Sequence, residues 1–596
     1  MKLFSASSAG LALLLSAASS RAMARPENST YYNPVLPGWH SDPSCTQVDG
    51  TFFCATSTFI SFPGLPIYAS KDLVNWKLVS HAWNRESQLP GVSWNTTGQQ
   101  QGMYAPTLRH RRGVFYVVCE YLLTGENIGV VFRTADPFRD AAWRDPVLFR
   151  PAAIDPDLFW DDNDDNDDAD GRLYVATQGV VLQELDLATG ELSQPPVSLW
   201  NGTGGAWPEG PHLYRRDGWY YLVIAEGGTE LNHSVTVARS RGVAGPYEAY
   251  ARNPVLTNRG TAEYFQTVGH GDLFQDAAGN WWGMALATRC GPTYAVYPMG
   301  REAVLFPVTW EEGAWPVLQP VRGAMSGWPL PPANREDVPG DGPFNSDPDV
   351  YDFSEGSSIP RNLVYWRVPR AGAFTTTADG LQIVPSRNNL TGTPLSATTP
   401  ELSGQRGLSF VGRRQTDTLF TYSVDLTFRP RQPGQEAGVA VFLTQVNHID
   451  LGVVLLAGAG NSSNSTCASR QTRQLALRFR AEGTGGAPEP QIIAIPEDWL
   501  DGDAVRIRLQ IEAANATHYS LAAMPAADPD ARILVGTASA ALVSGGNGSF
   551  VGSLVGAYAT CNGAGAGVEC PEGGNAYFNR WRYSGMGQYI SETEVV

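Results

Sequence analysis

Short apolar runs alternate with turn residues along the first half of the chain, and one arrangement of them recurs five times. A turn containing Gly or Asp separates each recurring segment from a run of apolar and aromatic residues, which is typical of a β-hairpin. The segments begin at Asp42, Ala105, Asp155, Glu209 and His270, and the runs that follow span 52–56, 115–118, 173–176, 219–223 and 281–285. Five such units, spaced by roughly 50–60 residues, predict a five-bladed β-propeller over residues 31–326.

The five starting positions should lie on one ring around the propeller axis, because rotation relates the equivalent positions of radial repeats. Three of these positions are carboxylates, namely Asp42, Asp155 and Glu209. One alternative is that each residue only shapes its turn, since Asp before Pro is common in loops. Three acids at matching positions favour a shared funnel, in which we expect the carboxylates to converge.

The pattern changes after a linker rich in Pro and Gly, which we place at 327–349. From about Val350, alternating apolar and polar positions recur without the repeated motif, as in 419–426 and 505–511. This alternation is typical of strands with one buried face. We therefore predict an all-β fold class, with the five-bladed β-propeller followed by a C-terminal β-sandwich over 350–590.

Composition and charge narrow the function classes. The chain has 596 residues, of which 43% are hydrophobic and 17% are charged, so a core can form and wholesale disorder is excluded. The 63 glycines and 42 prolines suit short strands joined by tight turns. A net charge of −17 makes nucleic acid and anionic membrane surfaces poor partners.

The first 24 residues have the features of a secretory signal peptide. Lys2 precedes a short apolar run at 11–15, and Ala22-Met23-Ala24 is a cleavage pattern. No later stretch is long enough to span a bilayer, so we expect a secreted, extracellular protein. Several of the N-x-[ST] sequons should then carry glycans. These begin at Asn28, Asn95, Asn201, Asn232, Asn389, Asn461, Asn464, Asn515 and Asn547.

Seven cysteines allow disulfides in an oxidising compartment. Cys45 and Cys54 flank a turn and are candidates to bridge two strands. Cys561 and Cys570 enclose a Gly-rich loop and are a second candidate pair, for which Cys467 competes. An odd count leaves at least one free thiol, and none of the cysteines has the spacing of a metal site.

Three carboxylates in one pocket indicate glycoside hydrolysis. That reaction needs a protonated acid for the leaving oxygen and a second carboxylate for water or the anomeric carbon. A third carboxylate can raise the pKa of the acid. Nearby aromatic side chains would stack on sugar rings, although each alone also suits the core of a blade. The candidates are Trp39, Phe59, Tyr104 and Trp207.

At these residues the sequence resembles glycoside hydrolase family 43. The resemblance covers about residues 33–325 and consists of short sequence blocks that occur in the same order as in the family. These blocks are 33–44, 56–59, 62–64, 70–76, 105–106, 154–159, 209–214, 225–229 and 300–302. The resemblance implies a five-bladed propeller that hydrolyses with inversion, and we expect this protein to require no cofactor. The C-terminal part looks like the β-sandwich of the family's larger two-domain members.

The resemblance also implies roles for individual residues. Asp42 would be the general base and Glu209 the general acid, and Asp155 would orient the acid and set its pKa. His270 matches a histidine near the floor of the site, and Arg301 matches an arginine on the substrate side.

Two departures bear on the substrate. The chain has Tyr104-Ala105-Pro106-Thr107 where bacterial β-xylosidases of the two-domain group usually have Trp-Ala-Pro-Asp, and Ser41 replaces a proline before Asp42. These changes look more like fungal arabinofuranosidases. We therefore expect an exo-acting, inverting α-L-arabinofuranosidase whose partner is plant cell-wall arabinoxylan. A β-xylosidase using the same residues is the first alternative. A secreted carbohydrate-binding protein without catalysis is the second, and the three retained acids argue against it.

An acidic run at 161–171 partly matches the pattern of a calcium-binding loop. Asn166, Asp168, Asp170 and Gly171 match the first, third, fifth and sixth positions of a calcium loop, but the twelfth is Thr177 instead of Glu. A solvated acidic hairpin loop is the favoured interpretation. A structural calcium or sodium ion near His270 on the axis is another alternative, which a single histidine supports weakly.

Overall fold

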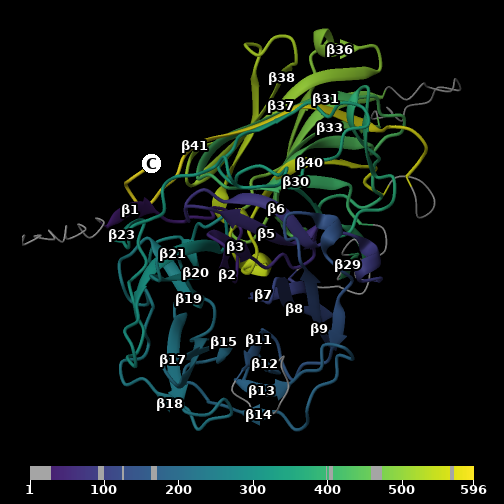
Figure 1. Cartoon of the computed structure of the whole chain (residues 1–596). Coiled ribbons are helices and arrows are strands. Elements are labelled where there is room, and N and C mark those ends of the chain that lie inside the picture. The colour runs from purple at the N-terminus through teal and green to yellow at the C-terminus, as the bar shows by residue number, and fades with distance from the viewer. Residues whose placement is uncertain are drawn as a thin grey trace, which may run out of the picture.

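The structure is a computed structural model of the chain, and it describes residues 28–91, 100–123, 126–162, 171–396, 399–401, 407–457, 473–563 and 570–596. Two β domains lie against each other, the first at the bottom of Figure 1 and the second at the top. The first contains five four-stranded sheets and the second two large sheets. The predicted five-bladed propeller followed by a sandwich is confirmed.

Each predicted repeat unit forms the first two strands of a blade. In every blade the first strand lies innermost and its neighbours follow outward by antiparallel hairpins, in the order of the chain. Blade 1 is β2 (Ser44–Val48), β3 (Thr51–Ala55), β5 (Gly64–Ser70) and β6 (Lys77–Trp83); blade 2 is β7 (Gly102–Arg111), β8 (Val114–Leu123), β9 (Glu126–Thr134) and β10 (Val147–Phe149); blade 3 is β11 (Asp157–Asp161), β12 (Arg172–Thr177), β13 (Val181–Glu184) and β14 (Val197–Ser198); blade 4 is β15 (Glu209–Arg216), β16 (Trp219–Glu226), β17 (Ser234–Ser240) and β18 (Glu248–Ala249); blade 5 is β19 (Phe265–Gln275), β20 (Trp281–Arg289), β21 (Glu302–Thr309) and β22 (Val317–Leu318).

The two ends of the propeller segment are joined to each other. Strand β1 (Ser29–Tyr32) pairs antiparallel with β23 (Ala324–Gly327), which follows blade 5. Tyr31 of β1 is buried and donates a hydrogen bond to the carbonyl of Leu305 in blade 5. The chain therefore closes the ring by attaching its first strand to its last blade.

The C-terminal domain packs two antiparallel sheets over one apolar core. Strand β31 shows why the sequence folds this way, because its buried and half-buried residues alternate along its whole length. One sheet contains β26 (Phe374–Thr377), β27 (Gly380–Ile383), β41 (Ala576–Gly587), β31 (Leu419–Phe428), β37 (Ala504–Asn515), β38 (His518–Pro525) and β39 (Ile533–Ser539), with β24 (Asp349–Tyr351) and β36 (Leu500–Asp501) beside them; the other contains β35 (Gln491–Ala494), β34 (Gln474–Glu482), β33 (Asn447–Leu456), β32 (Glu436–Thr444), β40 (Leu554–Thr560), β30 (Phe410–Arg414), β25 (Leu363–Trp366) and β4 (Ser61–Phe62).

A short hairpin and five single-turn 3-10 helices complete the described elements. They are β28 (Thr393–Ser396) with β29 (Thr399–Glu401), and η1 (Glu86–Gln88), η2 (Asp140–Ala142), η3 (Glu497–Trp499), η4 (Ala540–Val543) and η5 (Gly546–Gly548). No helix in the described ranges has the length and apolar character needed to cross a membrane.

The two domains interlock instead of being joined only by a linker. Strand β4 leaves blade 1 and pairs with β25 as the last strand of a sandwich sheet. Gly300 of the propeller has a φ of +63°, and a Cβ there would lie 2.3 Å from the carbonyl oxygen of Val551 in the sandwich. Only glycine suits this left-handed conformation and close approach. The sandwich is thereby held against the propeller face that carries the site described below.

The cysteine predictions are confirmed for the described residues. Cys45 and Cys54 lie opposite each other on β2 and β3 and form a disulfide. Cys561 and Cys570 form the second disulfide. Cys119 and Cys290 are buried free thiols, and Cys467 lies outside the described residues.

Candidate active site

A left-handed residue recurs within the innermost strands or just before them. Asp42, Ala105, Asp155 and His270 have φ values of 51°, 38°, 58° and 51°, and Gly210, directly after Glu209, has 55°. Such values are uncommon outside glycine and cost energy, so they mark places where the fold requires them. Bulges interrupt the pairing of β7, β15 and β19 at these same positions. The distortion turns the leading side chains from the blades toward the axis.

All five leading residues line one small cavity of about 100 Å³, which we call the carboxylate pocket. It also receives side chains from the sandwich and from later positions in the blades. Its lining is Asp42, Phe59, Tyr104, Ala105, Ile154, Asp155, Glu209, Thr229, His233, His270, Leu286, Arg301 and Phe550. The three predicted acids therefore lie together at one end of the propeller axis, with Ala105 between them.

Asp42 is buried and held by three neighbours. The hydroxyl of Ser57 donates to Asp42 Oδ2 over 2.6 Å. His270 Nδ1 and Arg301 Nη1 each lie 3.8 Å from Asp42 Oδ1. Burial lowers the pKa of His270 to about 4, although the charge of Asp42 opposes this, so the imidazole is neutral at physiological pH. Arg301 is thus the cation nearest to Asp42.

Asp155 and Glu209 have environments that favour protonation. Burial raises the pKa of Glu209 to about 7, although a hydrogen bond from Gln178 Nε2 over 3.0 Å and the charge of Arg301 both lower it. Burial also raises the pKa of Asp155 well above its usual value, and the charges of Glu209 and Asp42 add to this. The backbone N–H of Gly210 donates to Asp155 Oδ2 over 3.1 Å. This hydrogen bond ties Asp155 to the residue that follows Glu209.

The predicted sugar-binding residues divide into two groups. Phe59, Tyr104, His270 and Arg301 line the carboxylate pocket, with the rings of Phe59 and Tyr104 4.5 Å apart.

The structure does not place Trp39 or Trp207 among the lining residues. Trp39 is 2% exposed and stacks behind Phe59 at 5.9 Å, where the sandwich core covers it. Trp207 lies on a loop two residues before Glu209, and its side chain is 67% exposed. Neither ring can therefore contact a sugar inside the carboxylate pocket in this conformation.

Several lining residues were missed by sequence reasoning. Phe550 comes from the sandwich, and Arg301 Cζ lies 4.4 Å from the centre of its ring. The hydroxyl of Ser41 donates to the Phe550 carbonyl over 3.2 Å, which anchors the loop. No local motif marks this residue. Thr229, in contrast, ends the block 225–229 that carries the family resemblance, so that block contained a usable signal.

Glu120 of β8 is a fourth carboxyl group close to the site, and it was also missed. It is fully buried, and burial raises its pKa to about 8. Glu120 is therefore mostly protonated at neutral pH. When it ionises, its charge adds to the effects that raise the pKa of Asp155.

Beneath the carboxylate pocket, the propeller axis is occupied by an arginine. Arg109 Nη2 lies 2.8 Å from Asp157 Oδ1, and its Nη1 lies 3.0 Å from Asp272 Oδ2. Its Nη2 is also 3.1 Å from His212 Nδ1. Burial raises the pKa of Asp272, but the charge of Arg109 and further contacts outweigh this and lower it to about 2. The positive charge between the axial acids is therefore supplied by the protein.

This arrangement does not fit the proposed ion near His270, because the axial carboxylates already hold Arg109. Within the described ranges, no group of three or more His, Cys, Asp or Glu side chains is arranged to hold a metal ion. Of the residues that partly match a calcium loop, Asn166, Asp168 and Asp170 lie outside the described residues, so the favoured acidic hairpin loop stays a prediction.

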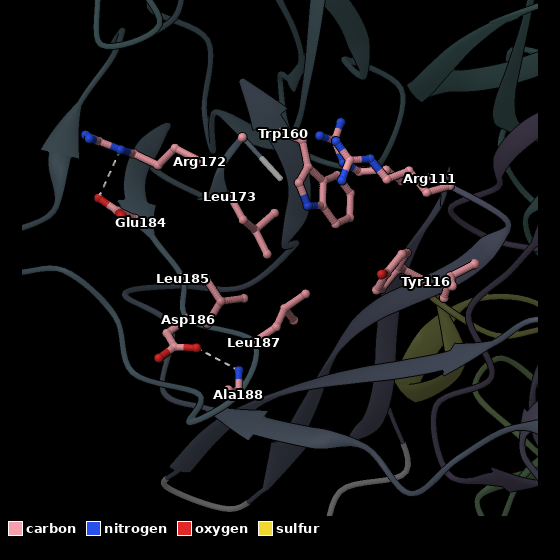
Figure 2. A pocket seen from close by; sticks show the side chains of 13 residues that line it. Arg111, Tyr116, Trp160, Arg172, Leu173, Glu184, Leu185, Asp186, Leu187 and Ala188 are labelled. Atoms are coloured by element: carbon pink, nitrogen blue, oxygen red, sulfur yellow. Dashed lines mark hydrogen bonds and ion pairs between the residues drawn. The ribbon is translucent and has the colours of Figure 1, made fainter. Parts of the chain in front are cut away.

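A larger cavity of about 620 Å³ lies between blades 2 and 3 (Figure 2). It is at the other end of the propeller, because Arg111 ends β7 and Trp160 is next to the end of β11. Trp160 and Tyr116 face the cavity in Figure 2, and Arg172 pairs with Glu184 at its edge over 3.6 Å. The predicted site residues do not line it. The acid-base chemistry therefore belongs to the smaller carboxylate pocket.

Comparison with known proteins agrees with this geometry. The family model for glycosyl hydrolases family 43 matches residues 31–316, and the model for the beta xylosidase C-terminal concanavalin A-like domain matches 350–584. A non-reducing end alpha-L-arabinofuranosidase from Bacteroides ovatus is 35% identical over 430 residues, which cover 71% of this chain and 75% of that protein.

Two further relatives show the same relationship. A xylosidase/arabinosidase from Butyrivibrio fibrisolvens is 32% identical over 436 residues, covering 71% of this chain and 79% of that protein. The crystal structure of a xylan beta-1,4-xylosidase from Bacillus halodurans superposes with a TM-score of 0.74 at 25% identity. That match covers 93% of this chain and 99% of the other.

Proposed function

The chain belongs to glycosyl hydrolases family 43 and is a glycoside hydrolase, and from this premise we propose that it is an exo-acting, inverting α-L-arabinofuranosidase that removes arabinose from arabinoxylan. The observation that carries the proposal is the carboxylate pocket, where Glu209 with a pKa of about 7 shares a cavity of about 100 Å³ with Asp42. The alternative of a binding protein without catalysis is not retained.

Asp42 and Glu209 divide the acid-base chemistry in this proposal. Glu209 gives its proton to the glycosidic oxygen as the bond to the anomeric carbon breaks. Asp42 accepts a proton from the water that attacks the same carbon from the opposite face. The Ser57 hydroxyl fixes the orientation of the Asp42 carboxylate. The sugar leaves with inverted configuration because water replaces the leaving group in one step.

Asp155 and Arg301 are proposed to position the reacting groups. Asp155 accepts from the N–H of Gly210, and its charge acts on the protonation of the adjacent Glu209. Arg301 lies between Asp42 and the Phe550 ring, where its guanidinium can donate to sugar hydroxyls. We propose that Phe59, Tyr104 and His270 form the remaining walls around the sugar.

Exo action is supported by the size of the cavity. A volume of about 100 Å³ has room for one sugar ring but not for a chain running through it. The sandwich contributes to this closure, because Phe550 covers one side of the pocket. The bond that is cut should therefore lie at the mouth, with the remaining polysaccharide outside.

Arabinofuranose is proposed as the sugar in the pocket because Tyr104 and Ser41 depart from the usual β-xylosidase residues and because a relative is named an arabinofuranosidase. A β-xylosidase remains the second candidate, which the match to the beta xylosidase C-terminal domain supports. The test compares kcat/KM on 4-nitrophenyl α-L-arabinofuranoside and 4-nitrophenyl β-D-xylopyranoside. A preference for the xylopyranoside would overturn the first assignment in favour of the second.

Secretion is a separate proposal. The expected signal peptide at 1–24 lies outside the described residues, whereas two disulfides suit an oxidising compartment. N-terminal sequencing of protein from the culture medium should show a chain that begins after Ala24. A chain that keeps its first residues and stays in the cells would contradict secretion.

A further inference from the structure

Trp207 stands out among the aromatic residues of this protein in two respects. Its side chain is 67% exposed, more than any other large hydrophobic residue in the described part of the chain. Its backbone has a φ of 52°, a conformation that non-glycine residues rarely adopt. Single exposed hydrophobic residues are ordinary on protein surfaces, but an exposed ring on a strained backbone requires a cause.

The cause lies in a buried carboxylate. Glu226, at the end of β16, is 1% exposed. Its Oε1 accepts hydrogen bonds from the backbone N–H groups of Thr203 and Gly205 over 2.7 and 3.2 Å. Its Oε2 accepts from the hydroxyls of Thr203 and Thr236 over 2.9 and 2.7 Å. Glu226 therefore binds the loop 201–207 to blade 4 from beneath.

The loop is shaped to fit this carboxylate. A Cβ at Gly202 would lie 2.2 Å from Glu226 Oε1, so the close approach requires glycine. The N–H of Gly227 donates to the carbonyl of Ala206 over 2.7 Å, which fixes the end of the loop. These contacts leave the Trp207 backbone little freedom, and the ring points into solvent.

Trp207 also lies at the mouth of the carboxylate pocket. It is two residues before Glu209, and its Cδ1 lies 3.9 Å from the position of a Cβ on Gly228. Gly228 precedes Thr229, which lines the pocket. Glu230 is near enough to act on the pKa of Glu209 and of Tyr294, whose own φ is 50°. The exposed ring is therefore on the rim where the leaving part of the substrate must lie.

We propose that Trp207 is a binding platform for a xylose residue of the xylan main chain, and that Glu226 is the positioning residue that holds it there. The inference rests on the proposed function, but it holds for both substrates considered, because the leaving part is a xylose chain in each. An exposed indole face suits the apolar C–H face of a pyranose ring. Specificity for a polymer over a small aryl glycoside would come from this contact.

The test measures kcat/KM on arabinoxylan relative to that on 4-nitrophenyl α-L-arabinofuranoside. In Trp207→Ala this ratio should fall about fivefold to tenfold below the wild-type ratio. In Trp207→Phe, which keeps an aromatic ring, the ratio should stay close to the wild-type ratio. Glu226→Gln should lower the ratio by a similar factor. The double variant should lose no more than Trp207→Ala alone, since the two residues act as one unit.

Two control variants test whether a cause other than loss of the platform lowers the ratio. Tyr32→Ala removes an exposed aromatic side chain, 47% exposed, on the distant strand β1, and it should keep the wild-type ratio. Asn201→Gln removes only the sequon of the same loop, so it measures any effect of a glycan there. A wild-type ratio in Trp207→Ala, or additive losses in the double variant, would overturn the inference.

A binding measurement decides the inference even without turnover. Xylohexaose is titrated into Asp42→Ala while tryptophan fluorescence is followed, and into the same protein carrying Trp207→Ala. The second protein should bind about fivefold to tenfold more weakly, and equal affinities would overturn the platform. If wild type hydrolyses neither arabinofuranosides nor xylopyranosides, the proposed function fails, and this titration still tests Trp207.

Discussion

Replacing Gln178 with leucine should move the alkaline limb of the pH profile of kcat/KM upward. Gln178 Nε2 donates to Glu209 Oε2 over 3.0 Å, and this hydrogen bond lowers the pKa of Glu209, which burial raises to about 7. The bond stabilises the ionised carboxylate and not the protonated acid. Without it the pKa of Glu209 rises, so the proposed acid keeps its proton to a higher pH.

The size of the shift follows from the strength of the bond. A hydrogen bond to a charged group contributes about 1.5–3 kcal/mol when it is fully formed. Gln178 is only half-buried, so water replaces part of this contribution in the variant. The variant then loses a net stabilisation of the ionised carboxylate of about 0.7–1.4 kcal/mol, which corresponds to a rise of roughly 0.5–1 unit in the pKa of Glu209. Because Glu209 and Asp155 titrate together, the apparent pKa read from the alkaline limb belongs to the pair of carboxyl groups. The expected shift of this apparent pKa is still upward.

The assay should use a substrate with a poor leaving group, such as methyl α-L-arabinofuranoside, because only such a substrate depends strongly on the acid. Values of kcat/KM are measured from about pH 5 to 9. Gln183→Leu is the matched control, since Gln183 Nε2 donates to the Ser193 carbonyl in the same blade, over 2.9 Å. The control should leave the limb in place. The reasoning would be refuted by a folded Gln178→Leu enzyme whose alkaline limb lies at the wild-type pH or at a lower pH.

Four further outcomes are expected. Asp42→Ala should lose on the order of 10²–10⁴ in kcat, as removal of a general base does, and a folded variant that retains kcat would disprove the role. Glu209→Ala should lose far more activity on arabinoxylan than on an aryl arabinofuranoside with an activated leaving group; equal losses would remove Glu209 as the acid. Proton NMR of the first sugar released should show inverted configuration, and retention would contradict Asp42 as base. Phe550→Ala removes the ring 4.4 Å from Arg301, so kcat/KM should fall about threefold to thirtyfold with little change in Tm; an unchanged kcat/KM would show that the sandwich only supports the propeller.

The propeller was predictable because its determinants are local and repeated. Each blade begins with a hairpin whose apolar runs and turn residues are adjacent in the sequence, and the period repeats five times. The convergence of Asp42, Asp155 and Glu209 followed from that repetition, since equivalent positions of a closed ring face the same axis. The sandwich was predictable from alternation such as that of β31, which is a property of single strands.

Other features depend on contacts between residues that are far apart in the sequence. Phe550 reaches the carboxylate pocket because the sandwich is held against the propeller by β4 and Gly300, and no pattern near Phe550 encodes that docking. Trp39 and Phe59 were equivalent candidates in the sequence. Both rings are buried against the sandwich core, but of the two only Phe59 also lines the carboxylate pocket.

Electrostatic behaviour was likewise decided in three dimensions. The sequence by itself determined which acids occur at the leading positions, because that is a matter of residue identity and period. Only the tertiary structure decided that burial raises the pKa of Glu209 to about 7 and that Arg109 occupies the axis between Asp157 and Asp272. Desolvation and ion pairing depend on what surrounds a group in space, and the surroundings of each of these residues come from several blades and from the sandwich.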